Sequence, residues 1–138
     1  MRQAQRVVRV ETTGPGFTEL TAEVAAVVRE SDIETGLCTV FVRHTSASLV
    51  IQENADPAVL RDLARWMADL APETPDWEHA DEGPDDMPAH ARSCLTRTAE
   101  SIPVGEGRLC LGTWQGLYLW EHRARGRTRQ IVVHVVGQ

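Results

Sequence analysis

Four short apolar segments follow one another in the last third of the chain, and the turns between them are too short to hold a helix. Glycine occurs in each turn, within residues 105–107, 112–116 and 125–127. Strands joined by such turns must pair antiparallel, because a parallel connection needs about a dozen residues or more. This feature constrains the fold most strongly, and it predicts strands over 101–104, 108–111, 117–122 and 129–136.

The first two thirds of the sequence add both strands and helices. Asp56-Pro57 is typical of a helix start, with a capping carboxylate followed by proline in the first turn, and Thr21 is a candidate cap for an earlier helix. We expect strands at 4–11, 37–44 and 48–52, and helices at 22–30, 57–70 and 88–96. Helices grouped in the middle of a mainly antiparallel chain predict an α+β fold, with 138 residues forming a single domain.

Composition restricts the partners. The formal net charge is −6, and all 14 basic residues are arginine. An acidic domain is a poor nucleic-acid binder, but local arginine clusters could hold a small phosphorylated ligand. We expect no secretory signal, because the first residues contain no apolar segment. We expect no membrane partner, because no apolar run is long enough to cross a bilayer. An odd number of widely spaced cysteines, 3 in all, indicates reduced thiols and a cytoplasmic location.

Histidine placement is the main chemical signal. His44 and His122 each end a predicted strand, on the face that apolar residues share, whereas His79 and His90 flank an acidic loop. Neutral imidazoles brought together from separate segments suit a divalent transition metal, particularly zinc. For any one histidine taken singly, a hydrogen-bonded, half-buried residue is the favoured explanation, because no HExxH spacing is present.

Two polar loops offer further candidates. Carboxylates between Asp81 and Pro88, Asp86 among them, could act as a general base or as metal ligands. The alternative is a solvated loop in which Asp86 sits favourably at a helix start. The turn that carries Thr45, Ser46 and Ser48 could bind an anion, although such hydroxyls commonly bond their own backbone.

Several ordered motifs together resemble the YjbQ family, whose members are described as secondary thiamine-phosphate synthase enzymes. The motifs are His44-Thr-Ser-Ala-Ser-Leu49, Glu53-Asn54, Asp85-Asp86-Met87-Pro88-Ala-His90, Gly112-Thr-Trp-Gln-Gly116 and Glu121-His122-Arg123. The resemblance covers essentially the whole chain. It implies a small α+β domain, a homotrimer and a bound metal, with zinc as the expected ion.

The resemblance also suggests roles for individual residues. His44, His79, His90 and His122 match the family's recurrent histidines, and among them our own inference selects His44, His90 and His122 as the metal ligands. Catalytic roles are expected for Asp86, Glu53 and His79. A phosphorylated substrate would contact Thr45, Ser46, Ser48, Arg92 and Arg123. The sequence departs from the family pattern at Gln52 and at Arg92-Ser93-Cys94, which puts phosphate contacts near Cys94 in doubt.

Three functions remain open. The first is a metal-dependent enzyme acting on small phosphorylated or heterocyclic substrates, with the joining of a pyrimidine diphosphate to a thiazole phosphate as the implied reaction. The second is a metal-dependent hydrolase in which Asp86 activates water. The third is a non-enzymatic trimer that binds a metal or a metabolite, because a fold does not fix a function.

Overall fold

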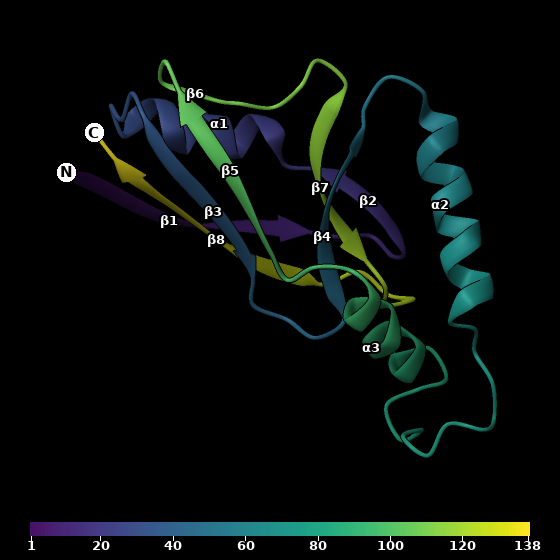
Figure 1. Cartoon of the computed structure of the whole chain (residues 1–138). Coiled ribbons are helices and arrows are strands. Elements are labelled where there is room, and N and C mark those ends of the chain that lie inside the picture. The colour runs from purple at the N-terminus through teal and green to yellow at the C-terminus, as the bar shows by residue number, and fades with distance from the viewer.

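The computed structural model describes all 138 residues as two antiparallel sheets and three helices (Figure 1). A five-stranded sheet has the order β1-β8-β3-β5-β6, and a three-stranded sheet has the order β2-β7-β4. The elements are β1 (Arg2–Glu11), β2 (Gly16–Glu19), α1 (Thr21–Glu30), β3 (Gly36–Val42), β4 (Ala47–Glu53), α2 (Pro57–Leu70), α3 (Asp86–Leu95), β5 (Ala99–Gly105), β6 (Arg108–Leu109), β7 (Gln115–Glu121) and β8 (Thr128–Gly137). The predicted α+β class is therefore confirmed.

The hydrophobic core is a cluster of 17 buried residues from both sheets and α1. Alternation along β8 decides which side chains enter it, since Ile131, Val133 and Val135 are buried whereas their neighbours are partly exposed. Helix α1 contributes Val24, Val27 and Val28 from one stripe. None of the helices combines the length and the apolar character that a membrane span requires.

Several predicted boundaries were wrong. Thr21 is the first residue of α1 and does not cap it, because its hydroxyl bonds to Glu19 and accepts from the backbone of Leu117. The sequence also gave no sign of β2, a four-residue strand that follows Pro15 and pairs with β7. Strand β3 ends at Val42, two residues before the predicted end.

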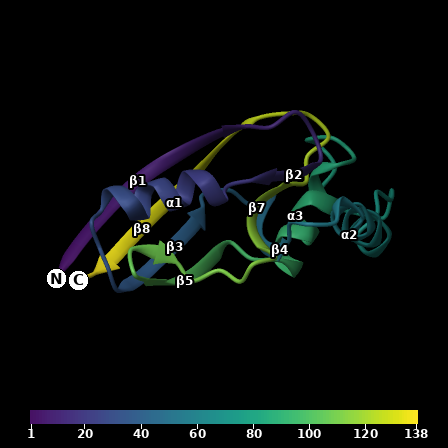
Figure 2. The ribbon, with the colours of Figure 1, turned by 90° about the horizontal axis from the view of Figure 1, so that it is seen from above.

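Helix α2 begins where the sequence predicted, with the Asp56 carboxylate accepting from the amide of Ala58 at 2.9 Å. The helix is poorly buried, because only Met67 is fully buried and Leu70 is 52% exposed. The reason is its position at the edge of the molecule, where it lies against β4 and leaves its other side uncovered (Figures 1 and 2).

Strands β4 and β7 bring distant segments to a common end of the smaller sheet. Ala47 pairs with Glu121 at this end, while Glu53 pairs with Gln115 at the other. Helix α3 is fixed there by Ser93, whose hydroxyl donates to the carbonyl of Ala47 at 3.2 Å. Figure 2 shows α3 near this end of the molecule, well away from the two chain termini.

Candidate functional site

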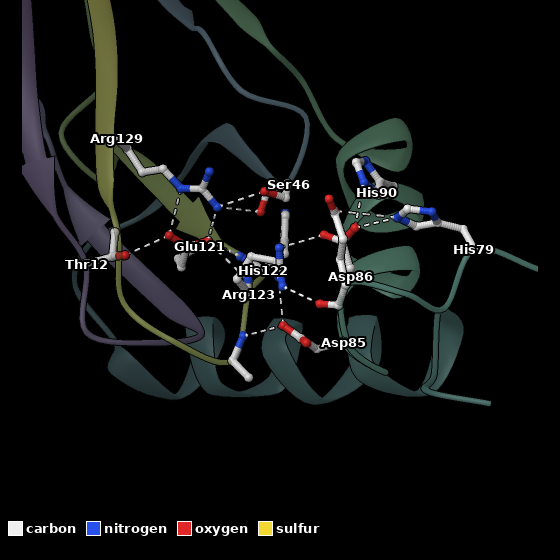
Figure 3. A network of polar contacts seen from close by, with 12 residues as sticks. Thr12, Ser46, His79, Asp85, Asp86, His90, Glu121, His122, Arg123 and Arg129 are labelled. Atoms are coloured by element: carbon white, nitrogen blue, oxygen red, sulfur yellow. Dashed lines mark hydrogen bonds and ion pairs between the residues drawn. The ribbon is translucent and has the colours of Figure 1, made fainter. Parts of the chain in front are cut away.

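Two histidines converge on one buried carboxylate at the start of α3. Asp86 and His90 are four residues apart and lie on one face of the helix, whereas His79 reaches in from the preceding loop (Figure 3). The Oδ2 atom of Asp86 lies 2.7 Å from Nε2 of His79 and 3.2 Å from Nε2 of His90. One ligand atom from each of these residues lies within 4.8 Å of the other two, which makes the cluster a candidate metal site.

Arg123 holds the other side of the same carboxylate. Its Nη1 atom lies 2.7 Å from Oδ1 of Asp86, while Nε donates to Asp85 at 2.8 Å and Nη2 to the carbonyl of Glu82 at 3.0 Å. Burial would raise the pKa of Asp86, but the hydrogen bond from His79 and the charge of Arg123 outweigh burial and lower it. Asp86 is therefore an anion at neutral pH, although its side chain is only 2% exposed.

The cluster is open on its histidine side. The side chains of His79 and His90 are 44% and 32% exposed. A pocket of about 400 Å³ lies against His79 and has Trp77 and Pro84 in its wall. A second pocket on the same loop is also lined by Trp77 and His79, together with Met87. A ligand in either pocket could therefore reach the His79 imidazole beside the Trp77 indole ring.

A buried ion pair stands behind the cluster. The Glu121 carboxylate accepts from the Arg129 guanidinium, from the Thr12 hydroxyl at 2.7 Å and from the amides of His122 and Arg123 at 3.1 Å each. Burial raises the pKa of Glu121, but these hydrogen bonds and the Arg129 charge lower it overall. The pair therefore fixes the backbone from which Arg123 reaches Asp86 (Figure 3).

His122 lies inside the protein and outside the cluster. Its ring is 2% exposed, and its Nε2 atom lies 2.8 Å from the hydroxyl of the fully buried Ser48. Burial lowers the pKa of His122 to about 3, with the nearby charge of Arg92 contributing. The ring is therefore neutral, buried, and hydrogen-bonded through Nε2 to Ser48.

His44 is also occupied elsewhere, since its Nε2 atom accepts from the amide of Gln130 at 2.9 Å. The structure thus brings together His79, Asp86 and His90, in place of the predicted trio of His44, His90 and His122. The difference arises because β3 ends at Val42, so strand alternation no longer sets where His44 points.

The other predicted site residues are dispersed. Ser46 and Ser48 turn inward, and the Ser46 hydroxyl accepts from Arg129 at 3.0 Å, so neither forms the exposed anion-binding turn that the sequence suggested. Thr45 of that turn is exposed. Arg92 donates twice to the carbonyl of Ala71, which ties α3 to the end of α2.

Glu53 lies far from the histidine cluster. It ends β4, at the opposite end from Ala47, about 20 Å along the strand at ~3.3 Å per residue. Its carboxylate accepts from the amide of Asp56 at 3.1 Å and supports the start of α2. This position favours a structural role for Glu53 over the expected catalytic one.

Sequence reasoning missed Arg129 and Thr12. One signal was available, since Arg129 shares the inward alternation of Ile131 and Val133 on β8. An arginine in register with core positions needs a buried acidic partner. Its partner here, Glu121, lies on the neighbouring sheet.

The buried His122 makes stability depend on pH in a defined window. The unfolded chain takes up a proton on this histidine near pH 6.5, whereas the folded chain resists it until about pH 3, so stability falls as the pH drops between these values. We expect urea denaturation to show that His122→Gln removes a slope of about 1.4 kcal/mol per pH unit near pH 5, between the two pKa values. An unchanged slope would show that the buried ring is not the responsible group.

Fold and cluster together define a small α+β protein with a histidine–carboxylate site at one end of its smaller sheet. The chain belongs to the UPF0047 protein YjbQ-like family, whose family model matches residues 6–138. It is 56% identical to UPF0047 protein sll1880 of Synechocystis sp. over 99% of this chain and 94% of that protein. It is also 39% identical to UPF0047 protein YjbQ of Salmonella typhimurium over 97% of this chain and 98% of that protein.

Solved structures of the family share the fold. An uncharacterized conserved protein of the YjbQ/UPF0047 family from Clostridium acetobutylicum superposes with a TM-score of 0.88 at 32% identity, covering 95% of this chain and 99% of that one. A conserved hypothetical protein from Thermus thermophilus gives a TM-score of 0.77 at 38% identity, covering 91% and 97%. The family assignment predicted from the motifs is therefore confirmed.

Proposed function

We propose that this chain binds a divalent transition metal, zinc in the first place, through His79, Asp86 and His90. The observation that carries the proposal is the ionised, buried Asp86 shared by two half-exposed imidazoles. Nitrogen and carboxylate oxygen are donors that zinc accepts, and three protein ligands leave a coordination position free, as in catalytic zinc sites.

The protonation of the two histidines is also compatible with metal binding. In the metal-free cluster, each Nε2 lies at hydrogen-bond distance from Asp86, so a proton on either nitrogen would point at the carboxylate. Metal binding would replace those protons, which makes the site weaker in acid. The pKa of His79 is raised, chiefly by its hydrogen bond to Asp86, so the loss of metal should begin above the ordinary histidine range.

The chemistry favoured at such a site is that of an enzyme acting on small phosphorylated or heterocyclic substrates. The metal would supply Lewis-acid stabilisation of charge developing on oxygen. The protein would supply the rest: Trp77 offers a flat wall for a ring beside His79, and Arg123 keeps Asp86 charged. The reaction implied by the family resemblance is the joining of a hydroxymethylpyrimidine diphosphate to a thiazole phosphate.

That reaction gives a direct test. Protein stripped of metal and then reloaded with zinc is incubated with both substrates, and pyrophosphate release is measured beside an Asp86→Asn variant and an Asp62→Asn control on the exposed side of α2. We expect turnover only in the reloaded wild type and in the control. Equal turnover in the stripped protein would contradict a metal-dependent enzyme.

Two alternatives give different outcomes in the same assay. A non-enzymatic binding protein would hold zinc, or a metabolite beside Trp77, tightly and show no turnover. A hydrolase, with Asp86 or the metal activating water, would release phosphate without forming the joined product. The exposed histidine side favours a site with a reacting ligand over a closed, purely structural one.

We propose further that the chain assembles as a homotrimer through the outer face of the larger sheet. Val7, Val132, Phe41 and Ala99 pair in one row across β1, β8, β3 and β5. A second apolar row contains Leu37 beside Val136 and Pro103. Phe41 is 45% exposed and Leu37 41%, and the two apolar rows are separated by a row that contains Gln5, His134 and Thr39. Exposed apolar side chains gathered on one face in this way mark an association surface.

The face makes a definite prediction for the oligomeric state. Light scattering should give the mass of a trimer for the wild type and the mass of a monomer for Phe41→Glu, because burying a carboxylate in the interface is strongly unfavourable. Trp66→Glu, a matched change at an exposed aromatic residue of α2, should leave the trimer intact. A trimer that survives Phe41→Glu would place the interface elsewhere, and a monomeric wild type would contradict the assembly.

A further inference from the structure

A third pocket, of about 530 Å³, is lined by Arg123, the residue that also holds Asp86 of the metal cluster. Its walls come from three segments that are far apart in the sequence. These are the β7–β8 connection at residues 123–127, the loop at residues 82–85, and Glu73 after α2. The pocket is therefore a feature of the fold and is not a gap within one loop.

Only one of the three arginines that line this pocket is paired with a carboxylate. Arg123 is fully engaged by Asp85, Asp86 and the carbonyl of Glu82. Arg125 and Arg127 line the same pocket, and neither takes part in an ion pair. Two guanidinium groups are thus left available to an anion.

Arg127 also has an unmet hydrogen bond. Its Nε is the one buried side-chain nitrogen or oxygen that has no hydrogen-bond partner in this structure. Its backbone is held from both directions by Thr12, whose hydroxyl accepts from the Arg127 amide at 2.9 Å and whose amide donates to the Arg127 carbonyl at 2.8 Å. The residue is therefore anchored while its guanidinium lacks an acceptor, which an anion in the pocket could provide after a side-chain rotation.

The pocket also carries two carboxylates that form no ion pair with an arginine. Glu73 and Glu82 line it, and the only ion-pair partner of either is His79, at 3.8 Å from Glu82. These carboxylates would repel a simple anion and attract a cationic group. A ligand that satisfies both sets of charges must carry both signs.

We propose that this pocket binds a small zwitterionic phosphate monoester, with its phosphate on Arg125 and Arg127 and its ammonium or cationic ring beside Glu73 and Glu82. Arginine suits the phosphate end because its planar guanidinium makes two parallel hydrogen bonds to such oxygens. The binding requires no metal, so it stands apart from the proposed zinc site even though the two share Arg123.

Calorimetry with metal-free protein and O-phosphoethanolamine as the probe tests the proposal. We expect saturable binding that Arg125→Gln and Arg127→Gln each weaken about tenfold or more, as expected for the loss of a charge-assisted contact. Both variants should still fold, because Arg125 is exposed and Arg127 is anchored through its backbone. Arg61→Gln, on the exposed side of α2, is the control that should bind normally.

The role of Glu73 and Glu82 is tested by measuring the binding of the two halves of the probe separately. Inorganic phosphate and ethanolamine should each bind more weakly than the zwitterion, and the double variant Glu73→Gln, Glu82→Gln should favour inorganic phosphate instead. Binding that is absent at millimolar probe, or unaffected by both arginine variants, would overturn the site. Equal binding of inorganic phosphate by the wild type would overturn its zwitterionic character. Zinc stoichiometry, measured separately, should be unchanged in the Arg125 and Arg127 variants.

Discussion

Replacing Arg129 with methionine will lower the free energy of unfolding by about 3–5 kcal/mol, the cost expected when one partner of a buried ion pair is removed. The side chains of Arg129 and Glu121 are 4% and 1% exposed, so solvent cannot compensate the carboxylate that remains. The hydrogen bonds from Arg129 to Ser46 are lost as well. Urea denaturation at neutral pH measures the change.

Two further variants show whether the unpaired charge is the cause. The double variant Glu121→Leu, Arg129→Met should be less destabilised than Arg129→Met alone, because no charge is left without a partner. Arg43→Gln removes an exposed arginine that bonds only to Gln130, and it should cost less than about 1 kcal/mol. An Arg129→Met variant as stable as the Arg43→Gln control would contradict the account of the network.

The second large effect is expected at Asp86. Asp86→Asn should weaken zinc binding by about 100-fold or more, because the change removes the only carboxylate of the proposed donor set while keeping its size. Competition with a chromophoric chelator gives the affinity. The Asp62→Asn change removes an equal charge from the exposed side of α2, away from the cluster, and should leave the affinity nearly unchanged.

The outcome also separates two explanations of the cluster. If Asp86 only orients the histidines by hydrogen bonding, asparagine retains one acceptor oxygen, and a loss of about tenfold or less would follow. If Asp86 is a ligand, the loss is large, and the histidines bind at most weakly without it. A nearly unchanged affinity in Asp86→Asn would therefore remove Asp86 from the metal site.

The strands could be predicted from the sequence because their signals are local. The short glycine turns predicted antiparallel strands, and the sheets are antiparallel. The predicted pairing across those turns holds only for β5 and β6, because β7 pairs with β2 and β4 and β8 pairs with β1 and β3. Helix α2 was located from Asp56-Pro57 alone. Strand β2 was missed because its four residues are stabilised by pairing with β7, which lies about a hundred positions later in the chain.

The site was predicted only in part, for a related reason. The helix was expected to start at Pro88, but α3 starts at Asp86, which places Asp86 and His90 on one helical face. His44 and His122 were predicted to be ligands because each ends a predicted strand on the face that apolar residues share. Their nitrogens are occupied by Gln130 and Ser48, partners that are 86 and 74 positions away and that no local pattern identifies.

Metal content measured by mass spectrometry on purified protein tests the central claim most directly. The wild type, His79→Ala, His90→Ala, His44→Ala and His122→Gln are compared after identical exposure to zinc. The account predicts about one zinc per chain in the wild type, in His44→Ala and in His122→Gln, and loss of zinc in His79→Ala and His90→Ala. Zinc that is absent from the folded wild type, or kept by His79→Ala and lost from His44→Ala and His122→Gln, would contradict it.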